Sequence, residues 1–253
     1  MWKLYDELYI GIPSGILITG CVVGEKWTTV RINGNIGIAR TLGVPENAFG
    51  FAAQFVNQPL RDTACHLRWD SPARASVGVA ALNAWYNTAD RAMGLNGLRS
   101  PSELVGKTAY VGDYSCGDVY AVPGSPDFDR SGYMALAEYD NVVIAGEALI
   151  TRALPGLLEI IGEDGKAVLE GPSLPLSALF FSFGSPVREI RGIYSQFADT
   201  VEGYAINNVS DLAPGVLPFS VVPSKVEKIH ESEQLLKAIN SPYKAVKFNN
   251  NFI

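Results

Sequence analysis

Three short apolar segments of the sequence end in a glycine that is followed by polar residues. The three endings are Gly112-Asp113, Gly146-Glu147 and Gly171-Pro172-Ser173. A carboxylate in such a position can act as a general acid or base, or it can bind a hard cation. Backbone N–H groups and a hydroxyl at the third ending can bind an anion. These residue types predict a polar binding site, provided that the fold brings the three endings together.

The side chains near these endings that could ligate a metal are Asp113, Cys116 and Glu147. The chain has 3 cysteines and 2 histidines, with no C-x-x-C, so neither a closed zinc site nor a disulfide framework is expected. Carboxylates suit a hard cation, or a metal that already carries an organic chelator, better than free zinc or copper. The cofactor is therefore left open, with a metal ion or a metal chelate as the candidate.

Each of these features also has a simpler interpretation. Asp113 can be a solvated loop residue, Cys116 a packing thiol, and Glu147 a first-turn residue that favours a helix N-terminus. The segment 171–173 can be a rigid turn without a ligand. No GxGxxG follows any of the apolar segments, and acids beside Gly112 would repel a pyrophosphate, so ordinary NAD or FAD binding is not expected.

The elements that position these residues follow from the pattern of the second half. Short, nearly all-apolar runs predict five strands, at Thr108–Val111, Val119–Val122, Asn141–Ala145, Ala167–Leu169 and Glu189–Ile193. Helical spacing over Leu154–Ile161 separates the third strand from the fourth, and this alternation predicts a mainly parallel α/β sheet. Because the carboxyl ends of parallel strands share one edge, the three glycine-containing endings are expected on one rim.

The first half predicts a small α+β unit. Residues 1–12 have helical spacing, and β-rich runs at 16–24, 27–32 and 36–41 predict an antiparallel sheet with a hairpin. Ser71 is the expected N-cap of a helix over 72–86 that covers this sheet. A polar, Gly-rich stretch near 88–106 marks the boundary, so we predict domains at residues 1–95 and 96–253.

Three connections carry predictions of their own. Ser100-Pro101-Ser102-Glu103 fits a capping box, which predicts a short helical turn. Ala213–Pro223 is rich in Pro and Gly and is predicted to be a loop. Ser224 with Glu227 forms another capping box, ahead of a C-terminal helix that would continue to Ile239.

The bulk composition excludes several classes of protein. Net charge is −6, and no basic run is present, so we expect no nucleic-acid partner. No apolar stretch approaches the length of about 20 residues that spans a bilayer, and no signal-peptide pattern opens the chain, so we expect a cytoplasmic protein without a membrane partner. Plentiful tyrosine and phenylalanine make an oligomer plausible, with a homodimer as the commonest outcome.

Four stretches resemble a known family. They are Cys21–Val30 (CVVGEKWTTV), Ala75–Asn87 (ASVGVAALNAWYN), Val142–Glu159 (VVIAGEALITRALPGLLE) and Val168–Gly184 (VLEGPSLPLSALFFSFG). Together they resemble the uncharacterised family labelled "putative heavy-metal chelation", over residues 1 to about 206. The resemblance implies an N-terminal domain like that of enolase, followed by a Rossmann-like domain.

The resemblance also implies a site in the cleft between the two domains. Its residues would be Gly24, Lys26, Thr28, Ser76, Asn83, Gly112, Gly146, Gly171, Pro172 and Ser173, and the family label implies a metal or metal-chelate ligand. Asp113 and Glu147, which differ from the family pattern, would add carboxylates to this cleft and favour a different ligand from that of the relatives.

The leading hypothesis is a two-domain protein that binds a small anionic or metal-bearing ligand in this cleft. One alternative is an enzyme that uses S-adenosylmethionine or a nucleotide, with Asp113 on the ribose hydroxyls. A second alternative is a non-catalytic, homo-oligomeric assembly protein. Whether the protein is catalytic is left open by the sequence.

Overall fold

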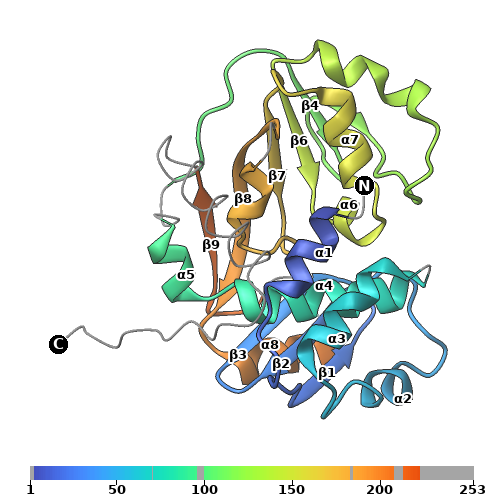
Figure 1. Cartoon of the computed structure of the whole chain (residues 1–253), viewed down its shortest axis with the longest axis vertical. Coiled ribbons are helices and arrows are strands. Elements are labelled where there is room, and N and C mark those ends of the chain that lie inside the picture. The colour runs from blue at the N-terminus through green and yellow to red at the C-terminus, as the bar shows by residue number, and fades with distance from the viewer. Residues whose placement is uncertain (1–2, 70, 96–99, 183–184, 208–212, 223–253) are drawn as a thin grey trace, which may run out of the picture.

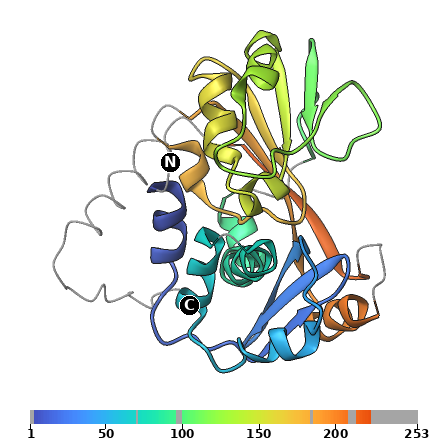
Figure 2. The same ribbon diagram turned by 90° about the vertical axis from the view of Figure 1, so that its right-hand side faces the viewer.

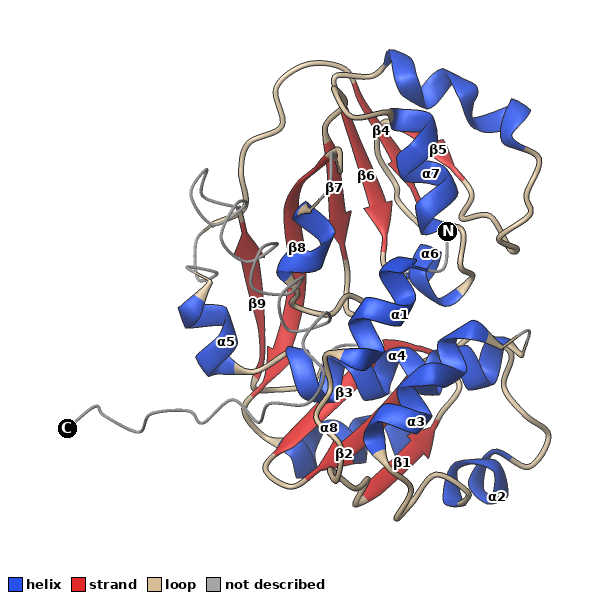
Figure 3. Cartoon of the chain, viewed as in Figure 1, coloured by secondary structure: helices blue, strands red, loops and turns tan. Residues whose placement is uncertain are grey.

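The structure is a computed structural model that describes residues 3–69, 71–95, 100–182, 185–207 and 213–222. The chain forms a three-stranded antiparallel sheet and a six-stranded, mostly parallel sheet, with helices around both (Figures 1 and 3). The predicted α/β class, a small antiparallel unit combined with a mainly parallel sheet, is confirmed. The predicted C-terminal helix from Ser224 lies outside the described residues.

The small sheet is formed by β1 (Gly20–Val23), β2 (Trp27–Ile32) and β3 (Asn35–Arg40), in that order. β2 pairs with β3 from Ile32↔Asn35 to Trp27↔Arg40, so a two-residue turn joins them, as the sequence predicted. Gly34 in this turn has φ +87°, which glycine adopts without a steric penalty. Successive side chains alternate between the faces of the sheet, and both faces are covered.

Helix α4 (Pro72–Tyr86) covers one face of the small sheet. Its start follows the predicted pattern, because Ser71 Oγ accepts a hydrogen bond from Arg74 N and Pro72 is the first helical residue. The backbone of α4 approaches β3 so closely that a Cβ at Gly37 would collide with Ala80 O. This close approach fixes the distance between helix and sheet.

The remaining helices of the first half pack around α4. They are α1 (Lys3–Ile10), α2 (Ala48–Ala53), α3 (Leu60–Ala64), a 3-10 turn at Cys65–Arg68, and α5 (Ala89–Gly94). Residues 60–68 thus form an α-helix that continues into a 3-10 turn.

Helix α8 (Ala198–Ile206), from the other half of the chain, covers the second face of the small sheet. Figure 2 shows α4 and α8 on opposite sides of this sheet. Trp27, Ile36 and Ile38 pack against Val201 and Ala205. A helix far along the sequence thus completes the small unit.

The large sheet has the order β5-β4-β6-β7-β8-β9. Its strands are β4 (Thr108–Val111), β5 (Asp118–Tyr120), β6 (Asn141–Ala145), β7 (Ala167–Glu170), β8 (Val187–Ser195) and β9 (Val216–Val221). All neighbours pair in parallel except β8 and β9. The helical elements of this half are α6 (Glu147–Ile150), α7 (Leu154–Ile161) and the 3-10 segments η2 (Arg130–Glu138) and η3 (Ala178–Phe181).

Two predictions about connections are wrong. The predicted loop 213–223 contains β9, in which Pro218 is tolerated because β9 is an edge strand. The predicted turn at 100–103 is not helical. Ser102 N instead donates to the carboxylate of Glu189, and Arg191 donates to Ser102 O. These tertiary hydrogen bonds compete with the local capping pattern.

Glu189 is 2% exposed and anchors this connection to β8. Burial acts to raise the pKa of Glu189, but hydrogen bonds from Arg191, Ser220 and Ser102 outweigh it and hold the pKa below its usual range.

Within the described part of the chain, no helix is long and apolar enough to cross a membrane. The main hydrophobic core runs without interruption from the α4 side of the small sheet to the large sheet.

Candidate functional site

The three glycine-containing endings lie side by side, as predicted. Gly112, Gly146 and Gly171 follow β4, β6 and β7, which are neighbours in the large sheet. Gly112 and Gly171 have φ of +152° and +120°, and a Cβ at Gly146 would lie 3.0 Å from Ser173. We refer to the loops that begin at these three glycines as the rim. Glycine is favoured at positions 112 and 171 by their positive φ, and at positions 112 and 146 because a Cβ would crowd Ala145 or Ser173.

The loop after Gly171 is bound by two asparagines of α4. Asn83 Nδ2 donates to Pro172 O (2.9 Å) and to Ile38 O (2.7 Å). One helical turn later, Asn87 donates to Leu174 O and accepts from Leu176 N. Both asparagines are buried. Helix α4 therefore joins the small sheet to the rim through side-chain amides.

Several predicted site residues are buried and form hydrogen bonds within this junction. Ser173 Oγ accepts a hydrogen bond from Arg40 N (2.9 Å), and Ser173 is 0% exposed. Thr28 shares a hydrogen bond with Thr41, and Ser76 Oγ accepts from Leu42 N while it donates to Pro72 O. Hydroxyl groups that are occupied in this way position the junction rather than face solvent.

The open part of the junction carries a cation and a carboxylate. Arg40, the last residue of β3, lies with Nε 3.6 Å from Oε1 of Glu147, the first residue of α6. Its guanidinium also stacks over Trp27, 5.3 Å from the ring centroid. The two charged side chains are 33% and 23% exposed. Because the two side chains are loosely paired and accessible, each could exchange the other for an oppositely charged group of a ligand.

The pKa of Glu147 is raised above its usual value. Burial is the largest cause, the neighbouring Asp113 acts in the same direction, and Arg40 opposes both. Asp113 and Glu147 therefore interact electrostatically, as the sequence predicted for two strand ends on one rim. A carboxyl group of this kind can accept or hold a proton more readily than a solvated one.

A second set of side chains flanks the rim on β7 and β8. Arg191 donates to Glu170 at 3.1 Å, at the end of β7. Burial raises the pKa of Tyr114, and Glu170 and Glu147 add to the effect. The phenol of Tyr114 is therefore neutral and lies in a field dominated by carboxylates.

Lys26 and Gly24 lie near this junction, whereas Asp118 lies away from it. Lys26 is exposed. It lies beside Arg40, because its carbonyl accepts a hydrogen bond from Thr41 N where β2 and β3 pair. Gly24 is buried in the preceding turn, with its N–H on Trp27 O. Asp118 starts β5 and accepts from Tyr139, so it lies at the opposite end of the strands from the rim.

Residues 112–117, which include Cys116, form no helix. This short connection returns directly to the start of β5, which is parallel to β4. Cys116 is exposed on it, and Gly117 lies against the ring of Tyr110. The thiol is therefore carried away from the strand ends.

The donor set does not suit a free metal ion. In the described ranges, no three His, Cys, Asp or Glu side chains are grouped so that they could hold one. Asp113, Cys116 and Glu147 thus do not make a ligand set by themselves. A metal that arrives with most of its coordination positions filled by an organic chelator needs fewer protein ligands, and Glu147 with Asp113 could supply them.

Sequence reasoning missed Arg40, Tyr114 and Arg191. Arg40 ends a β-rich run, Ile36–Thr41, so its position at a strand terminus was a usable signal. Its proximity to Glu147 was not, because 107 positions of sequence separate the two.

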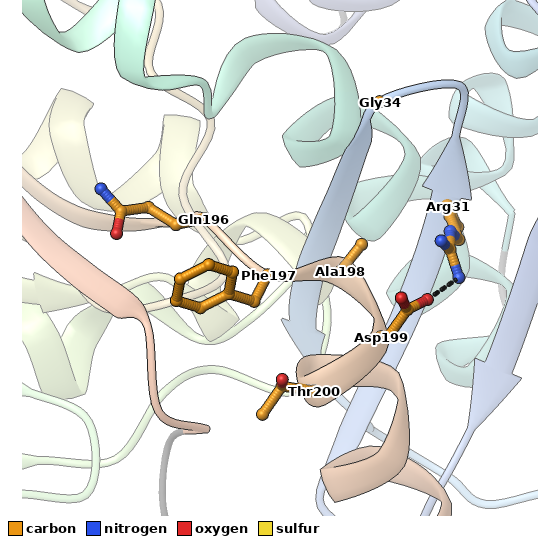
Figure 4. A pocket seen from close by; sticks show the side chains of 7 residues that line it. All are labelled: Arg31, Gly34, Gln196, Phe197, Ala198, Asp199 and Thr200. Atoms are coloured by element: carbon orange, nitrogen blue, oxygen red, sulfur yellow. Dashed lines mark ion pairs between the residues drawn. The ribbon is translucent and has the colours of Figure 1, made fainter.

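A separate pocket of about 380 Å³ lies between the turn of the small sheet and the start of α8 (Figure 4). Its lining includes Gly34, Phe197 and Thr200. Arg31, the cation that lines it, pairs with Asp199 at 2.6 Å and with Glu202 at 3.1 Å. Since its charge is already matched, this pocket is a weaker candidate than the rim.

Comparison with known proteins identifies the family. Residues 5–86 and residues 115–202 each match a sequence family described as "Putative heavy-metal chelation", and together the matches span more than half of the chain. The chain belongs to this family, which is described as "Putative heavy-metal chelation". No curated protein matches this chain.

Solved structures of this family are similar to the chain in fold. A protein with unknown function from Desulfitobacterium hafniense has 21% identity and a TM-score of 0.74, covering 88% of this chain and 98% of its own. A second protein with unknown function, from Pyrococcus horikoshii, has 15% identity and a TM-score of 0.62, covering 87% and 100%. At these identities the likeness concerns the fold alone.

Proposed function

We propose that this protein binds a small molecule at the rim, where Arg40 holds an anionic group and Glu147 with Asp113 holds the opposite, hydrogen-bonding or metal-bearing part. The observation that carries the proposal is the loose Arg40–Glu147 pair at the junction of the two sheets. A cation and a carboxylate that face each other from different sheets can each exchange the other for a ligand group of opposite charge.

The surroundings of this pair support a preformed site. The amides of Asn83 and the hydroxyl of Ser173 tie the rim to the small sheet through buried hydrogen bonds. Because these bonds need no rearrangement, Arg40 and Glu147 keep their separation when a ligand arrives, which lowers the entropic cost of binding. Backbone groups of Gly112 and Gly171 are partly exposed beside them.

A metal-bearing ligand fits this site better than a bare ion. The family description concerns heavy-metal chelation, and the described residues offer two accessible carboxylates but no three-residue ligand set. A metal brought by an organic chelator would supply the positive charge that Glu147 and Asp113 balance, while the acidic groups of the chelator would face Arg40.

Native mass spectrometry with elemental analysis, on full-length protein purified without a chelating agent, tests the proposal. We expect a retained organic mass, and we expect Arg40→Gln and Glu147→Gln each to lose it. Titration with citrate, alone and as its iron(III) complex, distinguishes an anionic from a metal-bearing ligand. Arg188→Gln, at an exposed position of β8, is the matched control and should retain wild-type binding.

Equal ligand retention by the wild type and both rim variants would refute this assignment. A thermal shift with S-adenosylmethionine that survives Arg40→Gln would favour the adenosyl-dependent alternative instead. The homodimer, the cytoplasmic location and the domain limits 1–95 and 96–253 stay predictions from the sequence.

A further inference from the structure

A groove of about 410 Å³ lies between α1, α7 and η3. Figure 1 shows α1 and α7 close together on one side of the large sheet. The apolar part of the groove comes from Leu4, Leu158, Leu179 and Phe180. Leu179 and Phe180 are almost completely buried, whereas Leu4 and Leu158 are half-buried. The groove therefore offers apolar surface that a further apolar side chain can cover.

The charged residues at the edge of this groove are mostly acidic. Glu7, Glu159 and Glu163 line it, against the single cation Lys3. Lys3 pairs with Glu7 at 3.8 Å, and Arg130 pairs with Glu159 at 2.9 Å. Glu163 is exposed. An occupant with lysines beside an apolar face would match both the floor and the edge.

The end of β9 lies at the same end of β8 as part of the wall of this groove. β9 is antiparallel to β8, and Val221 pairs with Ile190. The chain therefore leaves β9 beside the beginning of β8 at Val187. Ser185 and Pro186, which immediately precede β8, line the groove. Val222, the last described residue of this segment, therefore lies at the same end of β8 as Ser185 and Pro186.

The sequence after Val222 has the pattern that this groove requires. Val226, Ile229, Leu236 and Ile239 stand at spacings of three, seven and three, which places them on one face of the helix expected from Ser224. On such a helix Lys228 and Lys237 flank this face, and Glu227 and Glu231 fall on the opposite face. Lys225 and Glu233 fall within the arc of the apolar face. We propose that residues 224–239 of this chain bind in the groove between α1, α7 and η3, with the apolar face inward and the flanking lysines toward Glu159 and Glu163.

Zero-length carbodiimide cross-linking of the full-length protein, followed by mass spectrometry, tests the contact directly. We expect cross-links from Lys228 or Lys237 to Glu159 or Glu163. In an equal mixture of unlabelled and ¹⁵N-labelled protein, these cross-linked peptides should join segments of one copy. Cross-links only between copies would assign the groove to a second molecule and overturn the proposal, as would the absence of any cross-link between these lysines and the groove.

Hydrogen exchange provides an independent test with a matched pair of variants. Leu236→Asp charges the proposed inward face, whereas Ala238→Asp charges the opposite face of the same helix. We expect Leu236→Asp to accelerate amide exchange over 224–239 roughly tenfold or more, because the variant places a charge where an apolar side chain would be buried. Ala238→Asp should leave exchange unchanged. Equal exchange in both variants and the wild type would contradict the proposal.

Discussion

The junction between the two sheets has a buried part and an open part, and the two use polar groups differently. In the buried part, Asn87 makes three hydrogen bonds of 2.7–2.9 Å, to Leu174, Leu176 and Ile193. In the open part, Arg40 and Glu147 approach only to 3.6 Å, and both remain accessible. The first part links the C-terminal end of α4 to the rim and to β8, whereas the second links β3 to α6. The hydrogen bonds of Asn87 are shorter than the contact between Arg40 and Glu147.

The contrast indicates which part contributes stability and which part is free for a ligand. A buried amide without its partners is costly, so the buried part is expected to dominate the free energy of unfolding. A partly exposed, loosely formed ion pair contributes little to stability, so it can be changed at a small thermodynamic cost. Mutations in the two parts should therefore have separable effects.

The largest effect is expected at the closest contact of the buried part. Gly37→Ala would place a methyl group on the backbone of α4. This overpacking should lower the free energy of unfolding by about 3 kcal/mol or more, measured by urea denaturation. Gly203→Ala, in α8 with open space around its Cα, is the control and should be neutral or slightly stabilising. Equal stabilities of the two variants would contradict the close approach of β3 and α4.

Asn87→Ala should have the next largest effect on the free energy of unfolding. It leaves the buried carbonyls of Leu174 and Ile193 and the N–H of Leu176 without this partner. We expect a loss of about 3 kcal/mol in the free energy of unfolding, with an unchanged far-ultraviolet spectrum in the folded state. A loss below about 1 kcal/mol would show that the buried part is not what holds the sheets together.

Asn83→Ala sharpens the comparison within one helix. Asn83 lies one turn before Asn87, but its buried Oδ1 has no hydrogen-bond partner within the structure, so only the two donor bonds are lost. We expect a loss of about 1–2 kcal/mol, smaller than for Asn87→Ala. The order of the two variants in parallel urea titrations is the decisive measurement, and a reversed order would contradict this account.

The smallest effect on stability is expected from Glu147→Gln. Because the folded-state pKa of Glu147 is raised, the unfolded chain loses this proton first as the pH rises above about 4.5. Wild-type stability relative to the Gln variant should therefore fall as the pH rises above about 4.5, by less than about 1 kcal/mol. A difference that grows in the opposite direction would mean that Arg40, not burial, controls this carboxyl.

Much of the local structure followed from the sequence alone. The strands at 27–32, 108–111 and 141–145 and the helices at 72–86 and 154–161 have the predicted limits, because apolar periodicity and caps act over a few residues. The rim was also predictable, since parallel strands must place their carboxyl ends on one edge. That Asp113 and Glu147 follow neighbouring strand ends could therefore be predicted without coordinates.

The partners of these residues were decided only by the tertiary structure. Pro218 joined a strand because β8 offered an unpaired edge, and residues 100–103 gave up a helical turn because Glu189 and Arg191 bound Ser102. The approach of Arg40 to Glu147, and the burial that makes Ser173 and Asn83 parts of the junction, depend on how the two sheets pack across α4. Such contacts join residues distant in sequence, and no local pattern encodes the geometry of a long-range contact.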